Sequence, residues 1–203
     1  MWLYFLQGIG LGFAAAVQPG PLQTYLISQS LLRGWKRTLP AALAPLISDG
    51  PIIILCLLVL SQVPIWFQRF LYLAGGLFIL YLAFGAYRAW KDFDAKVPQP
   101  DSQSARQGIM RAALIIALSP GPYLYWSLIT GPILLKGWRD TPLYGIGFLA
   151  GFYATIIVTL GITILVFGMA RQVGPKVNRA LLGISAATLC IFGLYQLWLG
   201  MTG

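Results

Sequence analysis

Six long apolar runs, separated by short polar breaks, account for most of the chain. Because a helix of about 20 apolar residues crosses a bilayer, each run predicts one transmembrane helix. The six predicted helices are Trp2 to Leu32, Leu39 to Leu60, Trp66 to Trp90, Ile109 to Leu135, Leu143 to Gly168 and Val177 to Gly200. The pattern therefore predicts an all-α integral membrane protein that crosses the bilayer several times.

The composition excludes a soluble globular protein. Hydrophobic residues make up 58% of the 203 residues and charged residues only 9%, against about 25% charged residues in soluble domains. Six spans leave no room for a sizeable domain in water. The longest polar stretch, residues 91–107, is predicted to be a linker between a three-helix unit at residues 1–90 and another at residues 108–203.

The two predicted units repeat the same order of motifs. Gln18-Pro19-Gly20-Pro21 is followed by Gly34-Trp35-Lys36-Arg37-Thr38, and Ser119-Pro120-Gly121-Pro122 by Gly137-Trp138-Arg139-Asp140-Thr141. Because each unit has an odd number of spans, the second must enter the membrane in the opposite orientation. The sequence thus predicts a 3+3 inverted-topology repeat, an arrangement typical of secondary transporters.

The two Pro-Gly-Pro motifs are predicted to break helices 1 and 4. Proline has no N–H to bond the carbonyl four residues earlier, and glycine adds backbone freedom. Freed carbonyls are expected at Ala15, Val17, Ile116 and Leu118. Half-helices that begin after Pro21 and Pro122 would direct N–H groups toward an anion such as a carboxylate in a shared central cavity. The alternative is that both motifs only kink long helices for packing.

Asp49 is the one acidic residue well inside a predicted span. A carboxylate there is costly unless it is protonated, paired or hydrated, and no Lys, Arg or His lies at a comparable depth. We therefore interpret Asp49 as a group that binds a coupling proton or a substrate ammonium. The alternative is a local turn at Gly50 and Pro51 in which Asp49 bonds nearby backbone N–H groups.

Polar and aromatic residues beside these features complete the candidate site. The predicted substrate-binding residues are Gln18, Pro19, Gly20, Pro21, Gln23, Asp49, Ser119, Pro120, Gly121, Pro122, Tyr123 and Trp126. We expect no metal site and no cofactor, because the chain has no histidine, one buried Asp and two separated cysteines. We also expect no enzyme, since no nucleophile stands with a base or a metal. Gly8, Gly12, Gly147 and Gly151 are interpreted as helix-packing positions.

Basic residues predict the orientation in the membrane. The loops between spans 1 and 2, 3 and 4, and 5 and 6 hold eleven of them and the opposite side three, which gives cytoplasmic odd-numbered loops and both termini on the non-cytoplasmic side. The formal charge of +9 is thereby explained by topology and contact with membrane lipids, with no need for a nucleic acid. For the oligomeric state, the sequence is compatible with a monomer and with a homodimer.

The motifs also resemble a known family. Gly8, Gln18-Pro19-Gly20-Pro21, Arg33-Gly34 and Asp49-Gly50 resemble the lysine exporter (LysE/RhtB) family of amino-acid efflux transporters. The resemblance implies a protein of the prokaryotic cytoplasmic (inner) membrane that exports amino acids or related metabolites with the proton gradient. One departure is Ser119-Pro120-Gly121, where the family carries an Asn-Pro-Lys-like signature; the missing lysine implies different cavity chemistry.

The prediction is therefore a secondary active exporter of amino acids or related small metabolites. A carrier or channel for another small solute is one alternative. A membrane scaffold or assembly protein that transports nothing, in which the prolines are architectural, is the other.

Overall fold

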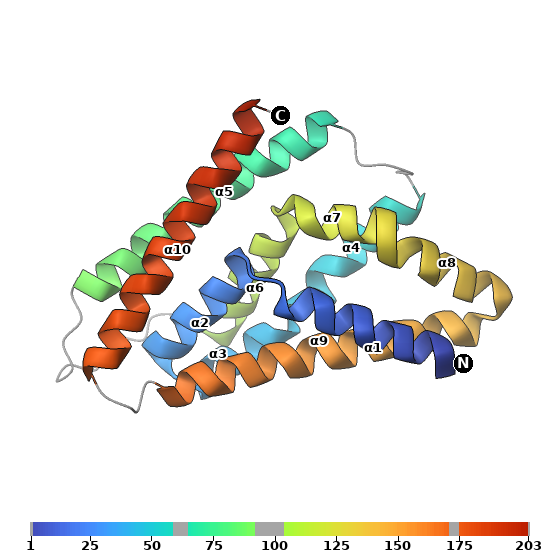
Figure 1. Ribbon diagram of the computed structural model, residues 1–203, viewed down its shortest axis with the longest axis horizontal. Helices are drawn as coiled ribbons and strands as arrows, with labels where there is room; N and C mark the ends of the chain where they lie inside the picture. Colours follow the sequence, from blue (N-terminus) through green and yellow to red (C-terminus); the bar gives the residue numbers. More distant parts are fainter. Residues whose placement is uncertain (1, 59–64, 92–103, 171–174, 203) are drawn as a thin grey trace.

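The computed structural model describes residues 2–58, 65–91, 104–170 and 175–202, and every element in these ranges is helical. The first half holds α1 (Trp2–Val17), α2 (Pro21–Arg33), α3 (Trp35–Thr38), the 3₁₀ helix η1 (Leu39–Leu43), α4 (Ala44–Leu58) and α5 (Ile65–Lys91). The second half holds α6 (Ala105–Ala117), α7 (Pro120–Tyr125), the π-helix η2 (Trp126–Thr130), α8 (Gly131–Asp140), α9 (Pro142–Ala170) and α10 (Pro175–Thr202). Figure 1 shows their arrangement.

The protein is a multi-pass membrane protein. Four stretches are long and apolar enough to cross a bilayer: Trp35–Leu55, Arg69–Arg88, Pro142–Ala170 and Arg179–Thr202. The pair α6 and α7–α8, bent by 61°, qualifies as a fifth span if it is counted as one. The first predicted span does not pass the same test, because α1 is apolar but has only 16 residues and the polar helix α2 follows it.

Helix breaks occur at both Pro-Gly-Pro motifs. α1 ends at Val17 and α2 begins at Pro21, whereas α6 ends at Ala117 and α7 begins at Pro120. The predicted start after Pro122 is therefore wrong: Pro120 and Pro122 both lie in the first turn of α7, where a helix needs no N–H from its residues. The chain turns at Leu118 and Ser119 instead.

The polar segment between the halves is described only at its ends. Residues 92–103, most of the predicted linker, lie outside the described residues. Ser104 starts α6 with a capping box, in which its hydroxyl accepts from Gln107 N and the Gln107 side chain accepts from Ser104 N. The last residues of the predicted linker thus belong to a helix.

Helices α1 and α9 pack side by side and run in the same direction (Figure 1). A Cβ atom placed on Gly8 or Gly12 would overlap the backbone of Phe148 or Phe152 in α9, and one on Gly151 would overlap the backbone of Phe5. The glycines therefore allow the two backbones to approach closely. This confirms the packing interpretation of Gly8, Gly12 and Gly151.

Helices α5 and α10 form the other close pair, and they run antiparallel (Figure 1). Gly76 lies against Gly193, whereas Trp90, further along α5, lies against Gly183, nearer the start of α10. The two helices also share a motif, Phe-Gly-x-Tyr-x-x-Trp, at residues 84–90 and 192–198. Each copy places its Tyr and Trp rings together, at centroid distances of 5.8 Å in α5 and 6.1 Å in α10.

Candidate functional site

Asp49 lies in the middle of α4 and is 5% exposed. The adjacent Ser48 Oγ is 3.4 Å from Asp49 Oδ1 and 3.1 Å from the Ala44 carbonyl oxygen. A hydroxyl carries a single proton, so Ser48 can donate to only one of these acceptors at a time. Ser48 alone therefore does not satisfy the carboxylate.

Two aromatic side chains from other elements donate to the same carboxylate. The Trp126 indole N–H, at the start of η2, and the Tyr153 hydroxyl, in the middle of α9, each form a side-chain hydrogen bond with Asp49. Trp126 is 1% exposed and packs edge-on against the ring of Phe152, with centroids 5.2 Å apart. One ionisable group thus joins α4, η2 and α9, and hydrogen bonds to a charged acceptor are the stronger kind.

A distorted turn positions Trp126. Residues Trp126–Thr130 form a single π-helical turn between α7 and α8. Pro132 has no N–H for the carbonyl of Leu128, which favours a rearranged turn there. Thr130 Oγ1 donates to the Tyr125 carbonyl oxygen at 3.0 Å and so stabilises the distortion. Such π-helical turns inside α-helices are frequent at functional sites.

The break between α1 and α2 consists of exposed and half-buried residues. Gln18 and Pro19 are exposed, and Gly20, Pro21 and Gln23 are half-buried. Gly20 is extended and provides no side-chain cap for α2, while Thr24 Oγ1 donates to the Gly20 carbonyl oxygen at 3.0 Å. In the described part of the chain, the first N–H groups of α2 thus have no acceptor from an N-cap side chain.

The second break satisfies much of its own backbone. Ser119 N–H donates to Ile116 O at 3.1 Å, so the expectation that this carbonyl is free is wrong. Tyr123 OH donates to Ala117 O at 2.8 Å. Ser119 Oγ donates to the carbonyl oxygen of Ile115 at 2.6 Å and does not cap α7.

The same region contacts both halves of the chain. The carbonyl of Leu118 faces Gly75 of α5 so closely that a Cβ atom there would overlap it. Tyr125 OH donates to Leu11 O of α1 at 2.9 Å, which ties the second break to the helix that precedes the first.

A pocket of about 250 Å³ lies between α4, α6 and α7, and Asp49 is not among its described lining residues, although the adjacent Ser48 is. Ser48 and Tyr123 line it, together with apolar residues such as Ile52 and Ala113. Residues Gln18 to Gln23 are not among its described lining residues. The structure thus brings Asp49 and Trp126 together and places Tyr123 at a pocket that Ser48 also lines, while the meeting of both breaks in one cavity stays a prediction.

Sequence reasoning missed Tyr153. Tyr153 lies within a long, mostly apolar run. The one feature that could have identified it is that a tyrosine hydroxyl group lies far from the predicted helix ends and so needs a hydrogen-bond partner inside the membrane.

Two further buried hydroxyl groups, those of Ser28 in α2 and Ser127 in η2, have no hydrogen-bond partner among the described residues. Buried polar atoms normally have a partner, so these two are candidates for contact with water or a polar solute. In the described ranges, His, Cys, Asp and Glu form no group of three that could hold a metal ion.

Comparison with protein families gives one match. A model of the LysE type translocator family matches residues 13–200. Comparison with curated proteins and with solved structures gives no match.

Proposed function

The chain belongs to the LysE type translocator family, and from this premise we propose that it exports amino acids or related small metabolites in exchange for protons. Family membership makes the protein a transporter. The proposal adds three points to this: the substrate is an amino acid, a proton drives its export, and the membrane is the prokaryotic cytoplasmic membrane.

The hydrogen bonds that converge on Asp49 carry the proposal. A carboxylate that is 5% exposed and bonded by Trp126 and Tyr153 can exchange a proton, and each protonation state favours a different set of bonds. Protonation weakens Asp49 as an acceptor and so loosens α4 from η2 and α9. Occupation of Asp49 by either a proton or a substrate ammonium would then couple binding to movement.

The start of α2 supports recognition of the substrate carboxylate. Its N-cap residue Gly20 provides no side-chain cap, and Gln18 and Gln23 lie on either side of it in the sequence. The predicted counterpart is the segment from Ser119 to Pro122, with Tyr123 and Trp126 as neighbours. A zwitterion would bind with its carboxylate at a half-helix and its ammonium at Asp49.

The packing supports the proposed inverted repeat of residues 1–90 and 108–203. If α1–α2 and α6–α8 are each one span, α5 is span 3 and α10 is span 6, which must run antiparallel, as they do. The Phe-Gly-x-Tyr-x-x-Trp motif occurs in both. Helices α1 and α9, as spans 1 and 5, run in the same direction. Alternating access would rock one unit against the other, with both termini on the non-cytoplasmic side.

The test is release of a labelled amino-acid mixture from proteoliposomes whose external medium is more acidic than the lumen. Wild type should release specific amino acids faster with the gradient than without it. Asp49→Asn keeps the shape but cannot release a proton, so it should lose the acceleration. Asp140→Asn is the matched control, because Asp140 is exposed at the end of α8.

Both variants must first elute as folded protein and unfold cooperatively in detergent, although Asp49→Asn is expected to unfold at a lower temperature because its acceptor is uncharged. Release from Asp49→Asn that still responds fully to the gradient would refute the coupling role of Asp49. Release of no amino acid by folded wild type, combined with release of another solute, would refute the proposed substrate class.

A further inference from the structure

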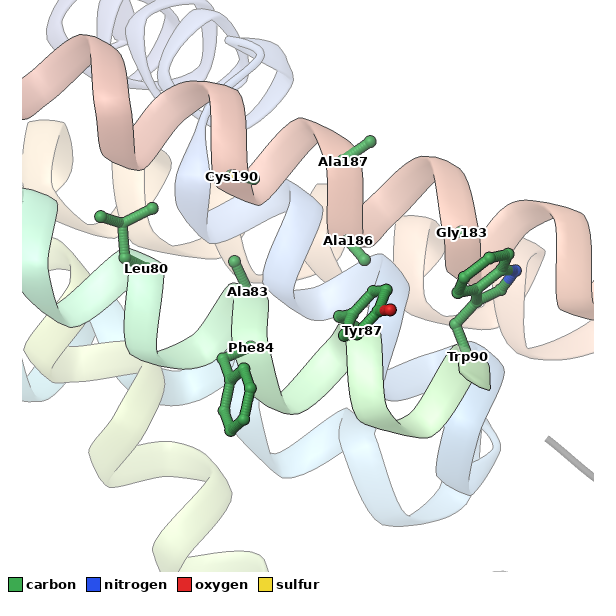
Figure 2. Close-up of a pocket in the computed structure, with 9 residues that line it drawn as sticks. All are labelled: Leu80, Ala83, Phe84, Tyr87, Trp90, Gly183, Ala186, Ala187 and Cys190. Atoms are coloured by element: carbon green, nitrogen blue, oxygen red, sulfur yellow. The ribbon is translucent and has the colours of Figure 1, made fainter. Parts of the chain in front are cut away.

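A groove separate from the Asp49 site runs along the α5–α10 pair (Figure 2). Its volume is about 570 Å³. Phe84, Tyr87 and Trp90 of α5 supply the large side chains, and small residues of α10 such as Gly183 and Ala186 leave the space open. Figure 2 shows Tyr87 and Trp90 directed from α5 toward α10, with Trp90 beneath Gly183.

Basic side chains lie along this groove toward the end that holds Trp90. The Arg88 guanidinium carbon is 5.4 Å from the centre of the Phe84 ring, and the Arg179 guanidinium carbon is 5.8 Å from the centre of the Trp90 ring. Because α5 and α10 are antiparallel, the end of α5 with Lys91 and the start of α10 with Lys176 lie at this same end. All four side chains are exposed.

The dimensions match one leaflet of a membrane. From Leu80 to Trp90 the groove follows α5 for about 15 Å, at about 1.5 Å per residue, which is half of a hydrocarbon core about 30 Å thick. Both helices qualify as membrane spans, so the apolar part of the groove lies at hydrocarbon depth. Trp90 then lies at the level of the headgroups, where tryptophan is enriched.

We propose that this groove binds an anionic phospholipid, with an acyl chain along Leu80, Phe84 and Tyr87 and the phosphate between Arg88 and Arg179. Clustered basic residues at the ends of transmembrane helices recognise anionic headgroups. A zwitterionic lipid carries its own cation and would leave the excess positive charge of the groove without compensation.

A second copy of the chain fits the groove less well. Two copies related by an axis along the membrane normal would place both sets of Arg88, Lys91, Lys176 and Arg179 at the same depth and close together. Like charges at such an interface repel each other. An anionic lipid instead neutralises them.

The test is native mass spectrometry of purified full-length protein titrated with phosphatidylglycerol or phosphatidylcholine. Wild type should bind phosphatidylglycerol preferentially. The double variant Arg88→Gln/Arg179→Gln should bind it roughly 30-fold more weakly, since each basic residue contributes about 1 kcal/mol at an anionic lipid and 1.4 kcal/mol is tenfold. Arg139→Gln, on an exposed basic residue of α8, should bind like wild type.

A second variant tests the apolar part of the groove. Ala187→Phe adds a ring at an exposed lining residue while it keeps every charge, so it should also weaken binding of phosphatidylglycerol. Equal binding of the two lipids by wild type would overturn the proposal. So would a lipid-free dimer that Ala187→Phe converts to monomer, because the groove would then hold a second copy.

Discussion

The indole of Trp126 donates a hydrogen bond to the carboxylate of Asp49, which joins residues from the two halves of the chain. Trp126 stands on the π-helical turn after the second break, and Asp49 stands in the middle of α4. Tyr153 adds a third element through its hydroxyl group. A change in the charge of Asp49 therefore alters its hydrogen bonds to both η2 and α9.

Trp126→Phe is expected to weaken this junction without removing the ring. The lost bond is one to a charged acceptor, so the free energy of unfolding should fall by about 2 kcal/mol. Gradient-driven release should fall with it, and Tyr153→Phe should act in the same direction. Trp138→Phe, on an exposed indole of α8, is the control. Unfolding in detergent and flux in proteoliposomes measure the two effects; wild-type values for both aromatic variants would contradict this account.

The glycines of α1 offer a matched pair. A methyl group on Gly8 would overlap the backbone of α9, whereas Gly10 has nothing within 4 Å of the same position. Gly8→Ala should therefore lower the free energy of unfolding by about 1–3 kcal/mol, as overpacking does. Gly10→Ala should leave it unchanged or raise it slightly, because alanine favours a helix. Thermal unfolding of both variants in the same detergent tests the contact; equal stability would show that α1 and α9 do not approach so closely.

Much of the fold could be predicted from the sequence, because apolar length and proline position act locally. The runs that gave α5, α9 and α10, and the breaks near Pro19 and Pro120, needed no knowledge of distant contacts. The Asp49 environment could not be predicted in the same way. Trp126 was named for its closeness to the break, but its partner depends on how η2 packs on α4, and Tyr153 is hidden in a uniformly apolar helix. The exact start of α7 depended on a turn that satisfied Ile116 O through Ser119.

Gly20→Ala and Gly121→Ala separate a binding role of the two breaks from an architectural one. An added methyl group at Gly121 meets nothing within 4 Å, and at Gly20 the nearest atom is 4.0 Å away. Neither change should destabilise the protein. A substrate carboxylate that approaches these backbones would, however, meet the methyl groups, so the concentration for half-maximal release should rise. Gly85→Ala in α5, also open, is the control. Loss of stability with an unchanged half-maximal concentration would show that the two breaks are architectural and do not bind substrate.

Disulfide crosslinking tests the antiparallel α5–α10 pair on which the inverted repeat depends. A Cβ atom on Gly76 would lie 3.0 Å from the Gly193 carbonyl oxygen, and one on Gly193 would lie 3.2 Å from the Gly76 carbonyl oxygen. In a background where Cys56 and Cys190 are replaced by alanine, Gly76→Cys/Gly193→Cys should therefore crosslink on mild oxidation.

The control pair is Gly85→Cys/Gly193→Cys. Gly85 is nine residues, or about 13 Å, further along α5 than Gly76. The crosslink is read as an intramolecular shift in gel mobility that reductant reverses. Efficient crosslinking of the control pair but not of the 76–193 pair would mean that α5 and α10 pair in another register, which would contradict the contact of Gly76 with Gly193.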